Sequence, residues 1–389
     1  MADGPVLSDA ESQATQALLA AAWGEDVRLR GAVPIWDRRH IVRVHDDSGR
    51  TAVLKRRRSH EPRIRVRGFG AEIAALEFFS PMPVPVAPRL LGVDTELGIV
   101  LMEDLGQGGS LAHALLGPDR AFARSALISY ARGLAAMHAW GIGREDEFAG
   151  IGARQAPGVT LVPHWMDFIE DGKAALLKTA LDWGLSTLAG HAVEEIGSLS
   201  PYLNDPRYAA LVHSDACPDN TQITDGTCRL FDFETSGWGP VALDAAYLLL
   251  PFPSCWCFAE LPADVSGEAM SEYRSAMSAA GVAMGPEWDA SLASALATLI
   301  TARGRALAEA VDRDNTWGTT TIRPRILTWL RGFASFPASA AVTPRLRELA
   351  ASMLERLESR WGSARVPSYP ALAMPGDVVG TIPDDWDEY

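Results

Sequence analysis

The chain has 389 residues, of which 48% are hydrophobic and 22% charged, a composition typical of a globular protein rather than a disordered one. Its 35 basic and 49 acidic residues give a formal net charge of −14. This balance argues against a general nucleic-acid binder, because such proteins need a basic surface to neutralise phosphates. Residues 1–105 carry a net charge of −1 (14 basic, 15 acidic) and residues 106–389 carry −13 (21 basic, 34 acidic), which favours a cationic partner for the second part.

The N-terminal residues are acidic where a secretory signal is basic, and the most apolar window, residues 241–258, is interrupted by an aspartate and two prolines. We therefore expect a cytoplasmic protein without a membrane partner. Four cysteines in a chain of this length do not form a disulfide framework, and Cys255-Trp-Cys257 lacks the spacing of a zinc site. The cysteines are predicted to be free thiols.

Residues 8–23 predict a helix with Ser8 or Asp9 as its cap. Two strand-like runs follow, separated by a polar turn, and a helical pattern starts at Phe69 and ends before a proline-rich stretch. Two further strand candidates come next. Residues 30–105 thus predict the order β-β-α-β-β, with strands at 40–44, 51–55, 89–93 and 98–102.

Beyond a glycine-rich patch at residues 106–109, helical periodicity dominates. Only residues 211–230 look like strands and loops, and the proline-rich tail after Trp361 is expected to be loosely held. We expect an α+β fold with two lobes: a small β-rich lobe over 1–105, a hinge near 103–109, a large helical lobe over 106–365 and a tail over 366–389. The expected helices lie near 121–140, 164–190, 268–281, 287–312, 321–333 and 343–361.

The segment LVHSDACPDNTQITDGTCRLFDFE, residues 211–234, carries the strongest chemical signal. Phosphoryl transfer needs an oriented hydroxyl group and metal ions that neutralise the charge of the nucleotide. A loop carboxylate can align the hydroxyl proton, while an amide oxygen and a second carboxylate can hold Mg²⁺. Asp215, Asn220 five residues later, and Asp232 after the next apolar run fit these three roles.

The same segment resembles the aminoglycoside phosphotransferase and choline kinase family, which has a protein-kinase-like fold. The resemblance rests on His213-Ser214-Asp215-x4-Asn220 and on Asp232-Phe233-Glu234, with Ser214 in place of the usual glycine. It implies that Asp215 is the catalytic base and that Asn220 and Asp232 bind Mg²⁺. It further implies supporting roles for His213, for Glu234 and for Asp244, a scaffold carboxylate behind the loop.

The resemblance also implies a nucleotide site in the first lobe. The strand that ends in Lys55 resembles the family's Val-Ala-Ile-Lys strand, so Lys55 is expected to contact the α- and β-phosphates. Glu72, or else Glu77, is expected to hold this lysine. The backbone from Glu103 to Leu105 is expected to bind the purine, which leaves ATP and GTP as alternatives.

Two features depart from the family pattern. Gly31 is the only glycine between residues 30 and 44, so Arg38 or Arg39 is expected to take over phosphate contacts from the usual glycine-rich loop. Seven of the 13 residues 55–67 are basic. Such a run is usually a solvated face; the alternatives are a flexible flap over the phosphates and a dock for an acidic peptide.

The sequence thus predicts an Mg²⁺-dependent kinase that phosphorylates a hydroxyl group. The first candidate acceptor is a small molecule, such as an aminoglycoside, another antibiotic or a metabolite. The alternatives are a peptide Ser/Thr kinase of natural-product maturation and a pseudokinase that serves as a binding module; the oligomeric state stays open. Among five tryptophans considered, Trp238 is expected near the acceptor because it follows the metal motif, and the other four in the core: Trp165, Trp183, Trp256 and Trp317.

Overall fold

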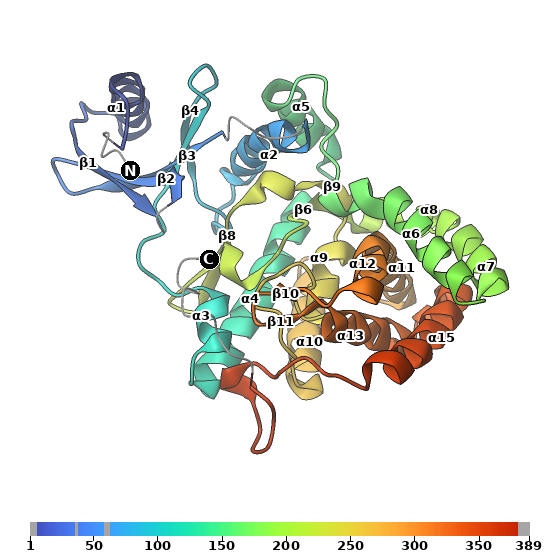
Figure 1. Cartoon of the computed structure of the whole chain (residues 1–389). Coiled ribbons are helices and arrows are strands. Elements are labelled where there is room, and N and C mark those ends of the chain that lie inside the picture. The colour runs from blue at the N-terminus through green and yellow to red at the C-terminus, as the bar shows by residue number, and fades with distance from the viewer. Residues whose placement is uncertain (1–5, 36–37, 58–62, 380–389) are drawn as a thin grey trace.

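A five-stranded antiparallel sheet forms most of the N-terminal part of the computed structural model, which describes residues 6–35, 38–57 and 63–379 (Figure 1). The strand order is β1-β2-β3-β5-β4. Strands that follow one another in the sequence are therefore neighbours in the sheet, except β3 and β4, which are separated by β5. The strands are β1 (Leu29–Ile35), β2 (Arg38–Asp46), β3 (Thr51–Arg56), β4 (Leu90–Asp94) and β5 (Ile99–Glu103).

Helix α1 (Asp9–Trp23) covers one face of this sheet, and α2 (Arg63–Phe79) follows β3 (Figure 1). The cap of α1 is Ser8, whose side chain and that of Glu11 bond reciprocally to backbone N–H groups. Against α1 lies a separate apolar cluster that includes Val42, Leu54 and Leu101. The expected elements β-β-α-β-β are found as β2, β3, α2, β4 and β5, but β1, which precedes them, was not predicted, and α2 starts six residues before Phe69.

The rest of the chain is mainly helical, with short strands only around the predicted catalytic segment and in one small hairpin (Figure 1). The expected α+β fold with a small β-rich lobe and a large helical lobe is confirmed. The longer helices are α4 (Arg120–Gly141), α5 (Glu145–Gln155), α6 (Ile169–Asp182), α7 (Ser186–Gly197), α10 (Ala263–Ala279), α11 (Pro286–Ala302), α12 (Gly304–Asp312), α13 (Ile322–Ser335) and α15 (Pro344–Trp361). The shorter ones include α3 (Leu111–Leu116), α8 (Ser200–Leu203), α9 (Ala242–Ala245) and α14 (Ser339–Val342).

Two of the expected helices are interrupted. The stretch 164–190 breaks between α6 and α7 at Gly184, which has a φ of +71°. The stretch 287–312 breaks between α11 and α12, where Gly304 approaches the backbone of α6 so closely that a Cβ atom would lie 2.1 Å from the carbonyl oxygen of Gly172. This contact requires a glycine at position 304 and explains why the helix changes direction there.

The segment after α15 corrects the expectation of a loosely held tail. Tyr369 and Leu372 are fully buried, and Ser368 pairs with Glu260 and with Val379 in isolated bridges. Residues 366–372 therefore pack into the helical part, while residues 380–389, with the acidic end of the chain, lie outside the described residues. Among the described helices, none combines the length and the apolar character needed to cross a membrane.

Candidate active site

The loop between β6 (Ala209–Val212) and β7 (Thr221–Thr224) carries the predicted catalytic residues and is held from behind by Asp244. This buried carboxylate accepts the backbone N–H groups of His213 at 2.6 Å and Ser214 at 2.8 Å, and it contacts Nε2 of His138 at 3.2 Å. Ser214 has a φ of +65°, the left-handed conformation that glycine adopts most easily. His213 and Asp244 thus shape the loop from its buried side.

Asp215 lies next to two side chains that approach it from different parts of the chain. Its Oδ1 accepts a hydrogen bond of 2.6 Å from the hydroxyl of Ser254. The amide of Asn220 donates to the backbone carbonyl of Asp215 at 2.9 Å and lies 3.5 Å from its Oδ2. Burial raises the pKa of Asp215, and the hydrogen bond from Ser254 opposes this rise.

Asn220 and Asp232 are brought together by the hairpin of β7 and β8 (Thr227–Leu230). The backbone N–H of Phe231 donates to the carbonyl of Asn220 at 3.0 Å, which places Asp232 beside the catalytic loop. Asp232 has a φ of +67°, and the 3₁₀ turn that contains Glu234 starts directly after it. Both predicted metal ligands therefore present oxygen atoms from neighbouring loop ends.

Lys55 reaches these carboxylates from the sheet. On β3, Ala52 and Leu54 are buried on the side of α1, and the alternating residues Val53 and Lys55 line the opposite cavity. The ammonium group of Lys55 lies 2.9 Å from Oε2 of Glu72, and it also bonds to the carboxylate of Asp232.

The partner of Lys55 is thus Glu72, and the alternative Glu77 is occupied elsewhere. Glu77 accepts hydrogen bonds of 2.6 Å from Arg154 and 2.7 Å from Gln155, both on α5. Glu72 lies in the middle of α2 rather than at its start, because the helix begins earlier than expected.

The charges of this cluster are strongly coupled. Burial lowers the pKa of Lys55, but the carboxylates of Asp232, Glu72 and Glu234 outweigh it, so the pKa lies above its usual value. Burial raises the pKa of Glu72, and the charge of Lys55 opposes this rise. Lys55 is therefore held as a cation by three neighbouring carboxylates.

The expected hinge contains an ion pair that sequence reasoning missed. Asp104 receives two hydrogen bonds from Arg43 on β2, at 2.6 and 3.0 Å. Glu103 uses its carboxylate differently, because it accepts from Arg229 at 2.8 Å and from the backbone of Arg89 at 3.1 Å. Among the hydrogen bonds of the described residues, none uses the backbone N–H or C=O of Leu105, so these groups are open to a ligand.

Most of the predicted site residues surround one cavity of about 350 Å³ between the sheet and the catalytic loop. His213 and Asp244 are not part of its wall and act from behind. The predicted residues that line the cavity are Lys55, Glu72, Glu103, Leu105, Asp215, Asn220, Asp232 and Glu234.

The basic run and the lone glycine have structural roles. Arg56 pairs with Glu11 at 2.6 Å, and Arg67 pairs with Asp167 at 3.0 Å, so neither is simply solvated. The run is also not one flexible flap, because α2 begins at Arg63. Residues 58–62, and the side chains of residues 38 and 39, lie outside the described part.

Gly31 lies within β1, where a Cβ atom would meet the ring of His45 at 2.4 Å.

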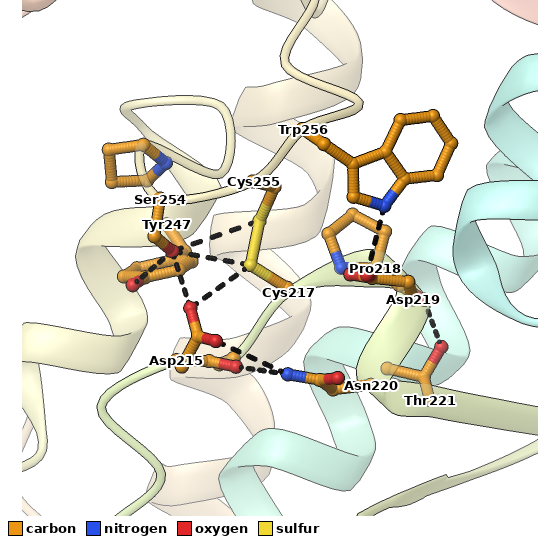
Figure 2. Close-up of a disulfide and its surroundings, with 12 residues drawn as sticks. Asp215, Cys217, Pro218, Asp219, Asn220, Thr221, Tyr247, Ser254, Cys255 and Trp256 are labelled. Atoms are coloured by element: carbon orange, nitrogen blue, oxygen red, sulfur yellow. Dashed lines mark hydrogen bonds between the residues drawn. A yellow bond between two sulfur atoms is a disulfide. The ribbon is translucent and has the colours of Figure 1, made fainter. Parts of the chain in front are cut away.

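A disulfide between Cys217 and Cys255 corrects the prediction of four free thiols, whereas Cys228 and Cys257 are free and buried (Figure 2). The sequence spacing of 38 residues gives no local signal for this pair. The disulfide joins the catalytic loop to the segment that carries Ser254. No residue of that segment was predicted to belong to the site.

Two tryptophans also differ from expectation. Trp238 stacks on Phe148 and meets Phe78 edge-on, so it belongs to the core and does not line the cavity. Trp256 is buried in the core as expected, and its Nε1 donates to Asp219 at 2.9 Å. Trp317, expected in the core, is 41% exposed.

One family model matches the chain, and several solved structures are similar to it. Residues 34–277, more than half of the chain, match the sequence model of the phosphotransferase enzyme family. A choline kinase structure from Streptococcus pneumoniae is 13% identical, with a TM-score of 0.49 over 83% of this chain and 99% of that one. An aminoglycoside phosphotransferase from Alicyclobacillus acidocaldarius is 16% identical, with a TM-score of 0.46 over 92% and 98%. A macrolide 2'-phosphotransferase from Brachybacterium faecium is 14% identical, with a TM-score of 0.42 over 76% and 95%. No curated protein matches the chain.

Proposed function

Because the chain belongs to the phosphotransferase enzyme family, we propose that it is a kinase that transfers the γ-phosphoryl group of ATP or GTP to a hydroxyl group of a small molecule. This membership confirms the family resemblance that the motifs indicate. One observation carries the proposal further. Lys55 and Glu72 from the N-terminal sheet and helix, and Asp215, Asn220 and Asp232 from the loops of the helical part, line the same cavity.

Each side chain has a role that its surroundings support. Lys55, held by Glu72, would bind the α- and β-phosphates, and the free backbone groups of Leu105 would bind the purine. Asp215 would orient the acceptor hydroxyl and accept its proton, for which its raised pKa is suited. The lobes would then correspond to residues 1–105 and 106–365, joined near 103–109, with a tail from residue 366.

The oxygen donors of the cavity suit Mg²⁺, which prefers carboxylate and carbonyl oxygens together with substrate phosphates. Asn220 and Asp232 would hold the ion, and both line the cavity together with Glu234. When bound, Mg²⁺ would neutralise the charge of the transferred phosphoryl group.

A small-molecule acceptor, such as an antibiotic or an amino-alcohol metabolite, is favoured over a peptide. A dock for an acidic peptide was one interpretation of the basic run, and both Arg56 and Arg67 are engaged in ion pairs within the chain. A pseudokinase is disfavoured because all of the expected catalytic side chains are present. We also propose a cytoplasmic location, where ATP and GTP are available; the Cys217–Cys255 disulfide would be an exception there, because cytosolic cysteines are usually reduced.

A panel of hydroxyl acceptors, incubated with ATP or GTP and Mg²⁺ and followed by mass spectrometry, tests the proposal. At least one acceptor should gain a phosphoryl group with the parent protein and not with an Asp215→Asn variant. Candidate acceptors should include cationic sugars, amino alcohols and a serine-containing peptide. Transfer to no acceptor, or equal transfer by both proteins, would refute the proposed function.

A further inference from the structure

Three consecutive residues contact alternate residues of the catalytic loop (Figure 2). We call Pro253-Ser254-Cys255-Trp256 the anchor segment. The hydroxyl of Ser254 bonds to Asp215, Cys255 forms the disulfide with Cys217, and the indole of Trp256 bonds to Asp219. The loop turns between these contacts, since the backbone N–H of Cys217 bonds to the carbonyl of Asp215 and Pro218–Asn220 form a 3₁₀ turn, and it thereby brings all three residues to the anchor segment.

The anchor segment is itself rigidly attached to the helical part. Arg303 donates to the carbonyl of Pro253 at 3.1 Å, and the fully buried Arg325 donates to the carbonyls of Cys255 at 2.7 Å and Trp256 at 3.0 Å. Buried charged donors make strong hydrogen bonds and are costly to leave unpaired. The position of Ser254 is therefore set by α11, α12 and α13 rather than by the flexible backbone of a loop.

The hydroxyl of Ser254 is oriented by a chain of donors that starts in the core. Trp165 Nε1 lies 3.2 Å from the hydroxyl of Tyr247. This hydroxyl lies 2.9 Å from Ser254 Oγ, and Ser254 Oγ lies 2.6 Å from Asp215 Oδ1. An indole nitrogen can only donate and an ionised carboxylate can only accept. Trp165 must therefore donate to Tyr247, and Ser254 must donate to Asp215. The proton of Tyr247 has Ser254 Oγ at 2.9 Å and the carbonyl of Ser214 at 3.4 Å as acceptors.

This bond matters because Asp215 has little else to fix its carboxylate. In the described part of the chain, its other protein donor is the Asn220 amide, at 3.5 Å from Oδ2, the outer limit of a hydrogen bond. A carboxylate that aligns an acceptor hydroxyl needs one rotamer, since an error of about 1 Å can cost about a hundredfold in rate. The short bond from Ser254 supplies this constraint.

We propose that Ser254 is a positioning residue, which acts through Asp215 by holding its carboxylate in the orientation that accepts the acceptor proton. The Cys217–Cys255 disulfide and the Trp256–Asp219 bond keep the anchor segment in register with the catalytic loop. The inference rests on the proposed kinase function for its kinetic consequence. Its structural consequence, a carboxylate of Asp215 held by the hydroxyl of Ser254, does not depend on that function.

The kinetic test compares Ser254→Ala with Ser254→Thr, which keeps a hydroxyl, and with Ser236→Ala as the matched control. Ser236 is buried in the turn after Asp232, and its hydroxyl has no hydrogen-bond partner among the described residues. With the best acceptor of the panel, Ser254→Ala should lower kcat about 10- to 100-fold and leave the KM for ATP nearly unchanged. Ser254→Thr should recover most of this loss, and Ser236→Ala should match the parent.

A double variant separates positioning from a general loss of structure. If Ser254 acts through Asp215, adding Ser254→Ala to Asp215→Asn should change the single-turnover rate less than about twofold, because coupled residues are not additive. Full additivity overturns the proposal. So does a Ser254→Ala enzyme as active as Ser236→Ala, or a Ser254→Thr enzyme no better than Ser254→Ala.

Hydrogen exchange tests the hydrogen bond between Ser254 and Asp215 without any acceptor substrate. Peptides that cover residues 213–220 should exchange faster in Ser254→Ala than in the parent, Ser254→Thr or Ser236→Ala. Unchanged exchange in Ser254→Ala overturns the positioning role. If the parent protein transfers no phosphoryl group while the variants still show this difference in exchange, the proposed function is refuted. That outcome would still support the contact of Ser254 with the loop.

Discussion

Arg43 donates two hydrogen bonds to Asp104, at 2.6 and 3.0 Å, although 61 residues separate them in sequence. The pair joins the second strand of the sheet to the residue that follows β5. Asp104 also accepts the backbone N–H of Gly106 at 3.0 Å, so the ion pair fixes the chain on both sides of Leu105. It thereby pre-orients the backbone groups that we assign to the purine.

Arg43→Ala should therefore weaken nucleotide binding more than it slows transfer. Hydrogen bonds to charged groups contribute about 1.5–3 kcal/mol, so the dissociation constant for ATP should rise about tenfold or more. Calorimetric titration with ATP measures it. Arg89→Ala is the control, because Arg89 is exposed near the same hinge and its side chain has no ion pair within the described residues. Equal affinities for both variants would contradict the role of the pair.

The same pair predicts a pH dependence of stability. Burial raises the pKa of Asp104, but the hydrogen bonds from Arg43 and from the backbone of Gly106 outweigh it, so the pKa lies below its usual value. A carboxyl group whose pKa is lowered by folding stabilises the protein above its unfolded pKa and loses this contribution as the pH falls. The parent should thus exceed Asp104→Asn in unfolding free energy near neutral pH, and the gap should shrink below about pH 4. Chemical denaturation at several pH values measures this; a gap that stays constant or widens in acid would contradict the assignment.

Asp215→Asn should abolish transfer without unfolding the protein. The loss expected for a group that positions and accepts a proton is about 10²–10⁴-fold in kcat. Since burial already raises the pKa of Asp215, replacing its charge with a neutral amide should not lower the melting temperature. Steady-state kinetics and thermal denaturation of the same preparations check both statements. A turnover within a few-fold of the parent would exclude Asp215 as the base.

Asn220→Ala and Asp232→Ala should each weaken the binding of nucleotide in the presence of Mg²⁺ and lower turnover together. Without Mg²⁺ the two variants should lose less affinity relative to the parent, because the ligands act through the ion. Asp232→Ala should also leave Lys55 paired with Glu72 at 2.9 Å, so the lysine site persists. Calorimetry with ATP, with and without Mg²⁺, distinguishes these cases. Unchanged affinity and turnover in both variants would place the metal elsewhere.

The catalytic segment was predictable because its signal is local. Asp215, Asn220 and Asp232 fall within 18 residues of sequence, and their spacing alone indicates one loop and one strand end. Ser214 stands where the family has a glycine, and its backbone is left-handed. Lys55 and Glu72 followed from the family resemblance, through the strand that ends in Lys55 and the helix that comes after it.

Ser254, Cys255 and Arg43 were not predictable, since their partners are distant in sequence and no periodic pattern connects them. Nothing local distinguishes a serine that bonds to Asp215 from an ordinary loop serine. The cysteine argument failed because it weighed the number of cysteines, while the disulfide depends on two loops that meet only in the folded chain. Tertiary contacts of this kind require coordinates.

The alternation of β3 has one more consequence, for folding rather than for chemistry. Moving this strand by a single residue against its neighbours would exchange its two faces and drive the ammonium of Lys55 into the apolar cluster around Leu54 and Leu101. An unpaired charge buried there costs several kcal/mol, far more than an exchange of aliphatic residues. The lysine that we assign to the nucleotide therefore also disfavours the misaligned sheet. A chain that buries its N-terminal apolar cluster in the correct register places Lys55 in the cavity at the same time.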